Sequence, residues 1–513
     1  MADATPSAAY HLLHNRRLLF TAVLLSTGCF TFGYDASVIG GALAMPPFVK
    51  QFGTLTPKGY VLTARTTSII VATPTSGALV GAAINSFCAD RFGRRKTMWL
   101  GCAISLLGAI LQTSSFSVAT ITVGRIFTSI SVFVLVGMAI TFQNELSPPS
   151  LKGLLGGVSV VSIQSAAVIA SGINWGTHSI PTSLAWRLPI GLQNVFPIII
   201  ATCTFFVMES PTALLIKGDD VRAEESLRRV RQGYSEEEIA DEMARLKMQK
   251  SLRAAEKEIS WLDLFRGTNL RRTILATYAG MMISLSGLIY ATNYATVFLE
   301  QVGETSPYML VFILNILTFA GAITGGALVD VIGRRRLALS SYTMILIIDC
   351  TIGGLGFAKL TSPSVAKAIA AFNLMFGFFV AVGFNVLTYI NTAEMPTARL
   401  RNKTNAFALL CNSLTSLTVT YVFPYISEPT GADLGAKTYL IFAGFMVVNL
   451  IFTFFCYPEV KGRSPAELDA MFEARLPARK FKDHVPLLLP GKDEGDYDGD
   501  AVAEKDQTVK AFE

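Results

Sequence analysis

Long apolar segments, separated by short polar ones, follow one another along most of the chain. Twelve can be distinguished, at residues 18–41, 61–88, 97–116, 118–142, 153–176, 189–208, 273–299, 307–329, 337–358, 366–392, 404–425 and 437–456. A helix of about 20 apolar residues is long enough to cross the roughly 30 Å hydrocarbon core of a bilayer. The pattern therefore predicts an all-α polytopic membrane protein with twelve transmembrane helices.

The composition agrees with this pattern. Hydrophobic residues make up 51% of the 513-residue chain, charged residues make up 16%, and the mean hydropathy is +0.47. Soluble proteins carry about 25% charged residues, so the composition excludes an ordinary soluble protein. The segment at 18–41 is too long for a removable signal peptide and lacks a small-residue cleavage site. It is predicted to be the first transmembrane helix.

The net charge of +6 reflects where the basic residues lie in the loops. Lys and Arg gather at 89–96, 332–336 and 399–403, whereas the short loops at 113–118 and 300–308 contain neither. Loops on the cytosolic side of a membrane carry the excess of Lys and Arg. We therefore expect both termini in the cytosol, a bilayer as the main partner, and no nucleic-acid partner.

A charged segment at 209–272 divides the chain into two halves. The predicted units are a cytosolic N-terminal tail at 1–17, six-helix bundles at 18–208 and 273–457, and a cytosolic C-terminal tail at 458–513 that is disordered from about 487. Ser235 and Glu238 have the spacing of a capping box. This spacing and the amphipathic pattern favour a small cytosolic helical subdomain at 209–272 over a solvated linker.

The two halves repeat each other. DRFGRR at 90–95 is echoed by DVIGRR at 330–335, and NELSPPSLKG at 144–153 is echoed by AEMPTARLR at 393–401. Each motif follows the corresponding apolar segment of its half. This duplication resembles the parallel repeats of the major facilitator superfamily, whose substrate site lies at mid-membrane between the halves. We therefore expect the major facilitator fold.

Further motifs resemble the sugar porter family of that superfamily. They are GYDASVIGG at 33–41, GR at 124–125, MESPTALL at 208–215 and PEVKGRS at 458–464. The C-terminal region and AEMPTARLRNKT are similar to the fungal branch that holds α-glucoside and lactose permeases. The resemblance covers roughly residues 18–480. It implies a secondary active transporter that moves a sugar or sugar-like solute by alternating access, in the plasma membrane and as a monomer.

The loop motifs imply a cytosolic gate. In the resembled family, ion pairs close this gate in the outward-open state and break in the inward-open state. An alternative is that the basic loops only set the topology, but Glu145 and Glu394 would then have no role. Lys152 stands where the family usually has arginine, whose bidentate fork lysine lacks. The predicted members are Asp90, Arg94, Glu145, Lys152, Glu209, Asp330, Arg334, Glu394, Arg399, Arg401, Glu459 and Arg463.

Two opposite charges are predicted deep in the apolar segments. Asp35 is 17 residues beyond Leu18, about 25 Å along the first helix, and Arg125 lies about 10 Å into the fourth from the other side. Both fall in the outer half of the bilayer and are expected to pair. A buried aspartate stays ionised beside an arginine and takes up a proton without one.

The resemblance implies that Asp35 and Arg125 couple transport to a proton. Alternatives are a static ion pair, or a facilitator without coupling. Asp349, in the ninth apolar segment, is a second buried acid, expected to form a local hydrogen bond. The seven cysteines are scattered singly, so neither a metal site nor a disulfide framework is predicted. No enzyme activity and no cofactor is expected, with the proton as the coupling ion.

The substrate-binding positions depart from the family. Two seventh-span glutamines and an asparagine are replaced by Ile283, Ser284 and Ile289, and the fifth-span glutamine by Val160. A solute in the usual hexose pose would lose several hydrogen bonds, so we expect a larger glycoside or disaccharide, or else a less hydroxylated metabolite. The predicted contacts are Gln164, Ser284, Asn293, Tyr294, Tyr389 and Asn412.

One alternative belongs to another class of function, a nutrient sensor that does not transport. Sensors of this fold carry a long cytosolic tail, and only about 55 residues follow the last apolar segment here. This favours transport.

Overall fold

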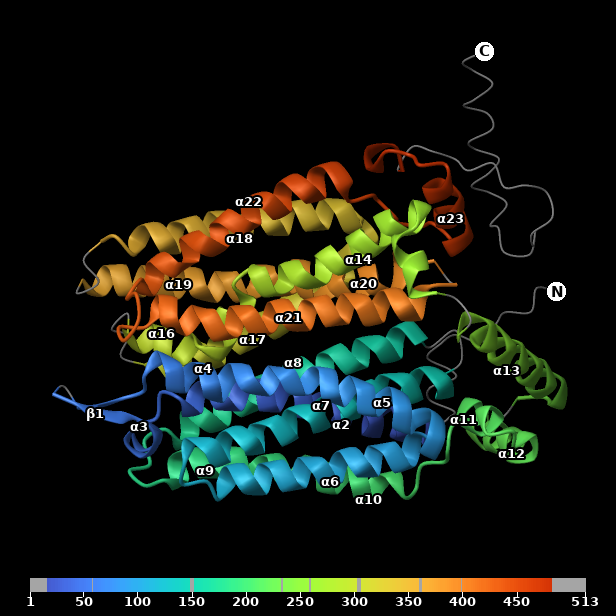
Figure 1. The fold of residues 1–513 in the computed structure, drawn as a ribbon, viewed down its shortest axis with the longest axis horizontal. Helices are drawn as coiled ribbons and strands as arrows, with labels where there is room; N and C mark the ends of the chain where they lie inside the picture. Colours follow the sequence, from blue (N-terminus) through green and yellow to red (C-terminus); the bar gives the residue numbers. More distant parts are fainter. Residues whose placement is uncertain are drawn as a thin grey trace, which may run out of the picture.

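The computed structural model describes residues 16–57, 59–147, 152–231, 234–257, 260–301, 306–358, 362–397 and 399–481. Long helices run side by side along the longest axis of the molecule (Figure 1). In this part of the chain, eleven helical segments are long and apolar enough to cross a membrane. The remaining predicted span is α6 (Arg94–Thr113), which begins with three basic residues. All twelve apolar segments are therefore helical, as predicted.

The N-terminal half contains the first six spans. They are α2 (Arg16–Ala42); α4 (Ala64–Ala72) continued through η1 (Thr73–Ser76) into α5 (Gly77–Phe92); α6; α7 (Val118–Leu146); α8 (Lys152–Thr177); and α9 (Leu184–Gly191), η3 (Leu192–Asn194) and α10 (Val195–Thr204). The second span changes to a 3-10 turn at Pro74, which has no backbone N–H to donate.

The C-terminal half contains the other six. They are α14 (Gly267–Leu285), α15 (Leu288–Asn293) and α16 (Ala295–Gln301); α17 (Pro307–Ile332); α18 (Arg334–Leu355); α19 (Pro363–Val380), η5 (Ala381–Asn385) and α20 (Val386–Glu394); α21 (Arg401–Ser427); and η6 (Gly435–Thr438) with α22 (Tyr439–Cys456). Two spans are broken. Gly287 has φ +88, a left-handed conformation that separates α14 from α15, and η5 is a π-helical turn.

Short helices gather at one end of the molecule (Figure 1). These are α11 (Pro211–Ile216), α12 (Asp220–Val230), α13 (Glu236–Lys257), η4 (Trp261–Phe265), α23 (Pro465–Glu473) and η7 (Ala478–Phe481). The expected capping box starts α13, because Glu238 accepts from the Ser235 amide at 2.8 Å and its own amide donates to the Ser235 hydroxyl at 3.2 Å. The loops at 89–96, 332–336 and 399–403 lie here, so we call this the basic end.

A small extension lies at the opposite end (Figure 1). It consists of α3 (Pro46–Phe52) and an antiparallel hairpin of β1 (Thr54–Thr56) and β2 (Gly59–Val61), with Thr54 opposite Val61. The all-α prediction missed this hairpin, because strands of three residues are too short to show an alternating pattern.

Candidate substrate cavity and buried ion pair

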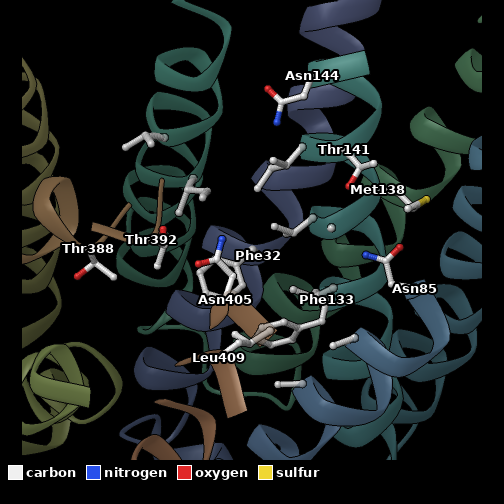
Figure 2. A pocket seen from close by; sticks show the side chains of 18 of the residues that line it. Phe32, Asn85, Phe133, Met138, Thr141, Asn144, Thr388, Thr392, Asn405 and Leu409 are labelled. Atoms are coloured by element: carbon white, nitrogen blue, oxygen red, sulfur yellow. The ribbon is translucent and has the colours of Figure 1, made fainter. Parts of the chain in front are cut away.

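A cavity of about 2040 Å³ lies between the two halves. It extends from Asp35 and Arg125 to exposed residues at the basic end, among them Asp90 and Arg245. Figure 2 shows part of its wall, where Asn85 and Thr141 of the N-terminal half and Thr392 and Asn405 of the C-terminal half line the same space. Ligand pockets for drug-sized molecules measure roughly 300–1,000 Å³, so the cavity has room for a disaccharide and its water.

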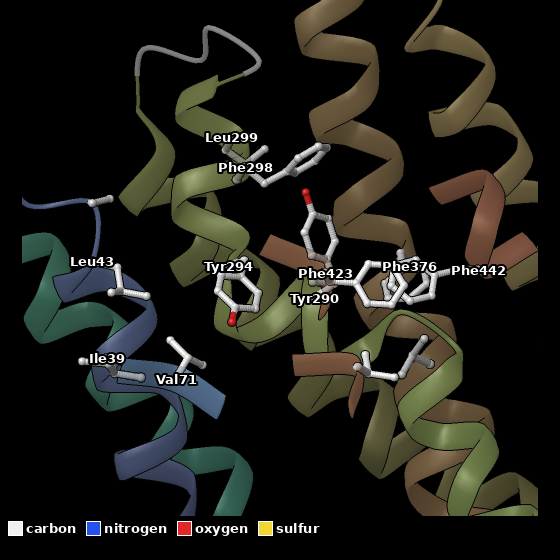
Figure 3. Close-up of a cluster of buried hydrophobic side chains, with 14 of the residues drawn as sticks. Ile39, Leu43, Val71, Tyr290, Tyr294, Phe298, Leu299, Phe376, Phe423 and Phe442 are labelled. Atoms are coloured by element: carbon white, nitrogen blue, oxygen red, sulfur yellow. The ribbon is translucent and has the colours of Figure 1, made fainter. Parts of the chain in front are cut away.

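The other end of the cavity is closed by apolar side chains from both halves (Figure 3). Ile39, Leu43 and Val71 of the N-terminal half belong to one buried cluster with Tyr290 and Tyr294 of the C-terminal half. The halves are also joined there by hydrogen bonds, one from the Ser68 hydroxyl to the Tyr421 carbonyl at 2.8 Å. We call this the closed end. This cavity thus opens toward the basic end.

Asp35 and Arg125 lie together in the cavity wall near the closed end. Arg125 Nη1 is 3.8 Å from Asp35 Oδ1, an ionic contact too long for a hydrogen bond, and the side chains are only 6% and 14% exposed. Arg125 Nε donates instead to the Ile70 carbonyl at 3.1 Å. Asp35 Oδ1 has no hydrogen-bond partner among the described residues. The structure therefore brings the two charges together as expected, but holds Asp35 loosely.

The predicted substrate contacts fall into three groups. Gln164, Ser284 and Asn412 line the cavity. Ser284 donates to Asn412 Oδ1 at 3.0 Å, and Gln164 Nε2 has no hydrogen-bond partner in the described part of the chain. Tyr294 lies instead in the closed end, where its hydroxyl donates to the Thr420 carbonyl at 3.0 Å. The side chains of Asn293 and Tyr389 lie outside the described residues.

Several polar side chains of the cavity wall were not predicted. Asn315 and Thr318 come from α17, and Asn385, Thr388 and Thr392 follow one another across η5 and α20. Polar residues at helical spacing within an apolar span are a signal that could have identified the second set. The apolar replacements predicted from the sequence, Val160, Ile283 and Ile289, also line the cavity.

The predicted gate residues Asp90, Arg94, Glu145 and Glu209 of the N-terminal half form a compact cluster at the basic end. Arg94 makes a bidentate contact with Glu145, at 3.0 Å and 2.7 Å, and lies 3.9 Å from Asp90. Glu209 accepts from the backbone amide of Arg94 at 2.9 Å and so caps the start of α6. A carboxylate at this position is favourable, because the first N–H groups of a helix have no partner within the helix.

The C-terminal half repeats this arrangement. Arg334 lies 2.9 Å from Asp330 and 3.1 Å from Glu394, and Glu459 accepts from the Arg334 amide at 2.9 Å. Burial raises the pKa of Glu394, and the neighbouring Arg334 opposes this shift. Each of these ion pairs of Arg94 and Arg334 lies within a single half.

The remaining predicted gate residues are more dispersed. Arg399 is exposed and lines the cavity. Arg401 Nε has no hydrogen-bond partner among the described residues. Arg463 lies 3.8 Å from Glu467 of its own tail, and the side chain of Lys152 is outside the described residues.

The family model for sugar (and other) transporters matches residues 20–472. The chain belongs to this sugar transporter family of the major facilitator superfamily. Members of the family are transporters and not enzymes, as the sequence predicted. A relative is the general alpha-glucoside permease of Saccharomyces cerevisiae, 28% identical over 98% of this chain and 83% of the permease. Another is the high glucose sensor RGT2 of the same yeast, 26% identical over 90% of this chain and 61% of the sensor.

Solved structures of the proton:xylose symporter XylE share the fold of this chain. The XylE complex with 6-bromo-6-deoxy-D-glucose has a TM-score of 0.71 and 18% identity, and covers 90% of this chain and 100% of XylE. The inward open conformation of XylE from E. coli has a TM-score of 0.73 and 18% identity, and covers 88% of this chain and 99% of XylE. The match confirms the predicted major facilitator fold.

The second buried acid of this transporter, Asp349 on α18, was expected to form a local hydrogen bond. It is completely buried, and neither carboxyl oxygen has a hydrogen-bond partner within the described residues. The expectation is wrong in the described part of the chain. Asp349 lies away from the cavity wall, so its position gives it no contact with a solute there.

Proposed function

We propose that this chain is a proton symporter that takes up a sugar or sugar-like solute by alternating access. The observation that carries the proposal is the Asp35–Arg125 pair, which lies in the wall of the same cavity that a solute would occupy. A charged pair at this depth is costly, and such residues by default mark a path for ions or substrate.

The geometry supports proton binding at Asp35. Its contact with Arg125 is ionic, Oδ1 accepts no hydrogen bond from the described residues, and the side chain lines the cavity. A small further separation of Arg125 would leave a buried carboxylate without a counter-charge, which favours its protonated form. Release of the proton toward the basic end would then restore the pair. The cavity allows solute and proton to leave in the same direction.

The cavity wall supports a glycoside or disaccharide over a free hexose. Ile283, Ile289 and Val160 cannot hydrogen-bond a solute, and each lost hydrogen bond costs about 0.5–1.5 kcal/mol. Gln164, Asn412 and Asn315 lie elsewhere on the wall, so a longer solute would reach more polar groups. The likeness to an alpha-glucoside permease points the same way. We propose further that the basic end faces the cytosol from a plasma membrane, that the chain acts as a monomer, and that Arg94 and Arg334 belong to a cytosolic gate.

A second candidate is a transporter of a non-sugar metabolite. The apolar side chains of Val160, Ile283 and Ile289 favour it, because a solute with fewer hydroxyls leaves fewer hydrogen-bonding groups unsatisfied at an apolar wall. Both candidates share the Asp35–Arg125 pair, so only the solute distinguishes them.

The test is proton and solute uptake by a transport-deficient yeast that expresses the chain. Glucose, maltose, lactose, cellobiose, a polyol and quinate are added one at a time, with wild type compared with Asp35→Asn. We expect the medium to become alkaline on addition of maltose or another disaccharide, and this signal to be lost in Asp35→Asn. Solute accumulation that survives Asp35→Asn without any proton signal would make the protein a facilitator. A response to quinate alone would favour the non-sugar candidate.

A further inference from the structure

A third acidic group lies at the closed end, outside the cavity. Glu428 directly follows α21 and is 6% exposed. Its carboxyl group is hydrogen-bonded to Thr67 of α4, in the N-terminal half, and to Thr430, in the C-terminal half. Thr430 in turn accepts from the backbone amide of Ala64, the first residue of α4, at 2.9 Å. The carboxyl group thus lies in the contact between the two halves.

The groups that face Glu428 are hydroxyls and aromatic rings. Tyr290 and Tyr294 interact electrostatically with it, and Tyr294 also interacts with Arg125 on its other side. On α4 the charged residue is Arg65, which is exposed and acts on Tyr425 instead. Asp433 contributes its backbone amide to the Glu428 carbonyl at 3.2 Å. Among the described residues, the ion pairs do not include Glu428.

We propose that Glu428 is a second proton-binding site of the transporter, and that its protonation stabilises the closed end. A neutral carboxylic acid fits this dry contact, because it can donate one hydrogen bond and accept another from the two threonines. An ionised carboxylate there would be buried without a cation, which is unfavourable. The inference requires alternating access, but it does not require proton symport through Asp35.

The sign of the pH effect follows from burial. In the closed state burial raises the pKa of Glu428 from 4.5 to about 7, although hydrogen bonds from Thr67 and Thr430 oppose the shift. When the halves separate, water reaches the carboxyl group and its pKa returns toward an ordinary value of about 4.3. Closing therefore takes up a proton. Between pH ~4.5 and ~7 the ratio of open to closed molecules rises by up to about tenfold per pH unit, and above pH ~7 it levels off.

The test is the accessibility of a cysteine buried at the closed end. Val71→Cys is placed in a variant without the seven native cysteines, and intact cells are treated with a membrane-impermeant maleimide. Val71 is 3% exposed and borders the cavity, whose mouth is at the basic end, so a reagent outside the cell reaches it only when the closed end opens. Leu55→Cys, on the neighbouring hairpin and 70% exposed, corrects for the pH dependence of the reagent and for the amount of folded protein at the surface.

We expect the corrected rate for Val71→Cys to rise at least tenfold from pH 5 to pH 7. In Glu428→Gln, which is neutral at every pH and keeps both hydrogen-bonding partners, the rate stays low and constant. The same rise in Glu428→Gln, or a constant rate with Glu428 intact, would overturn the inference. Asp35→Asn distinguishes this inference from proton symport, since the labelling rate of Val71→Cys should still rise with pH in that variant. A rise that is lost in Asp35→Asn and kept in Glu428→Gln would assign the effect to Asp35, which refutes this inference and leaves the proposed symport standing.

Discussion

At the scale of single residues, Gly33 allows a close contact between two transmembrane helices. A Cβ atom at Gly33 of α2 would lie 1.9 Å from the backbone carbonyl oxygen of Ile163 on α8. Small residues let helices approach closely in membranes, where packing drives association. Because backbone atoms cannot move aside as a flexible side chain can, α2 and α8 would have to separate.

We predict that Gly33→Ala destabilises the folded protein by at least about 1–3 kcal/mol, the usual cost of overpacking. Thermal unfolding in detergent measures the loss. Gly156→Ala is the matched control on α8, because a Cβ atom there would meet nothing within 4 Å. If the two variants unfold at the same temperature, the close contact does not limit stability.

Also at the residue scale, the Arg125 side chain makes two contacts at once. Its Nε donates to the Ile70 carbonyl, and its Nη1 lies beside Asp35. Lysine has one ammonium group and cannot reproduce both contacts. We predict that Arg125→Lys lowers solute-driven proton uptake about tenfold or more, because a hydrogen bond to a charged group contributes about 1.5–3 kcal/mol. Arg65→Lys, at an exposed position of α4, should transport normally. Normal coupling in Arg125→Lys would mean that the positive charge alone suffices.

At the scale of elements, the sequence predicts whole helices better than their breaks. The twelve apolar segments are distinct because each must satisfy its backbone within the membrane. The pairing of Asp35 with Arg125 could be predicted because charges stand out in such segments. Tyr294 was misplaced because it follows the break at Gly287, where the glycine is visible but the new helix direction depends on packing against the other half. The π-helical turn η5, which presents Asn385 to the cavity, leaves no pattern in the sequence.

A buried arginine joins α13 to the end of α7 at the mouth of the cavity. Arg231 makes a bidentate contact with Glu242 of α13, at 2.8 Å and 2.7 Å, and donates to the Leu146 carbonyl at the end of α7 at 2.6 Å. The Arg231 side chain is 1% exposed. Removal of the carboxylate would leave the buried Arg231 without its counter-charge, which costs about 3–5 kcal/mol.

We therefore predict that Glu242→Ala increases hydrogen exchange throughout Glu236–Lys257, because α13 detaches from α7. Glu225→Ala removes an exposed pair with Arg229 on α12 and should leave the exchange of α13 unchanged. Equal exchange in the two variants would show that α13 is held by its apolar contacts instead.

At the scale of the whole molecule, the two halves repeat each other in sequence but not in burial. In the N-terminal cluster the side chains of Arg94 and Glu145 are 3% and 6% exposed. In the C-terminal cluster those of Arg334 and Glu394 are 12% and 31% exposed. The N-terminal cluster is therefore the more buried and the C-terminal cluster the more hydrated. Removing one partner of a buried ion pair costs more stability than removing one partner of an exposed pair.

This asymmetry makes equivalent substitutions unequal. We predict that Glu145→Gln costs about 3–5 kcal/mol of stability, since it leaves the buried Arg94 without its carboxylate. Glu394→Gln should cost about 1 kcal/mol or less, because water can solvate Arg334 in its place. Thermal unfolding of both variants in the same detergent gives the comparison, with uptake measured in parallel. If Glu394→Gln is the less stable variant, the C-terminal cluster, and not the N-terminal one, is the more rigid of the two.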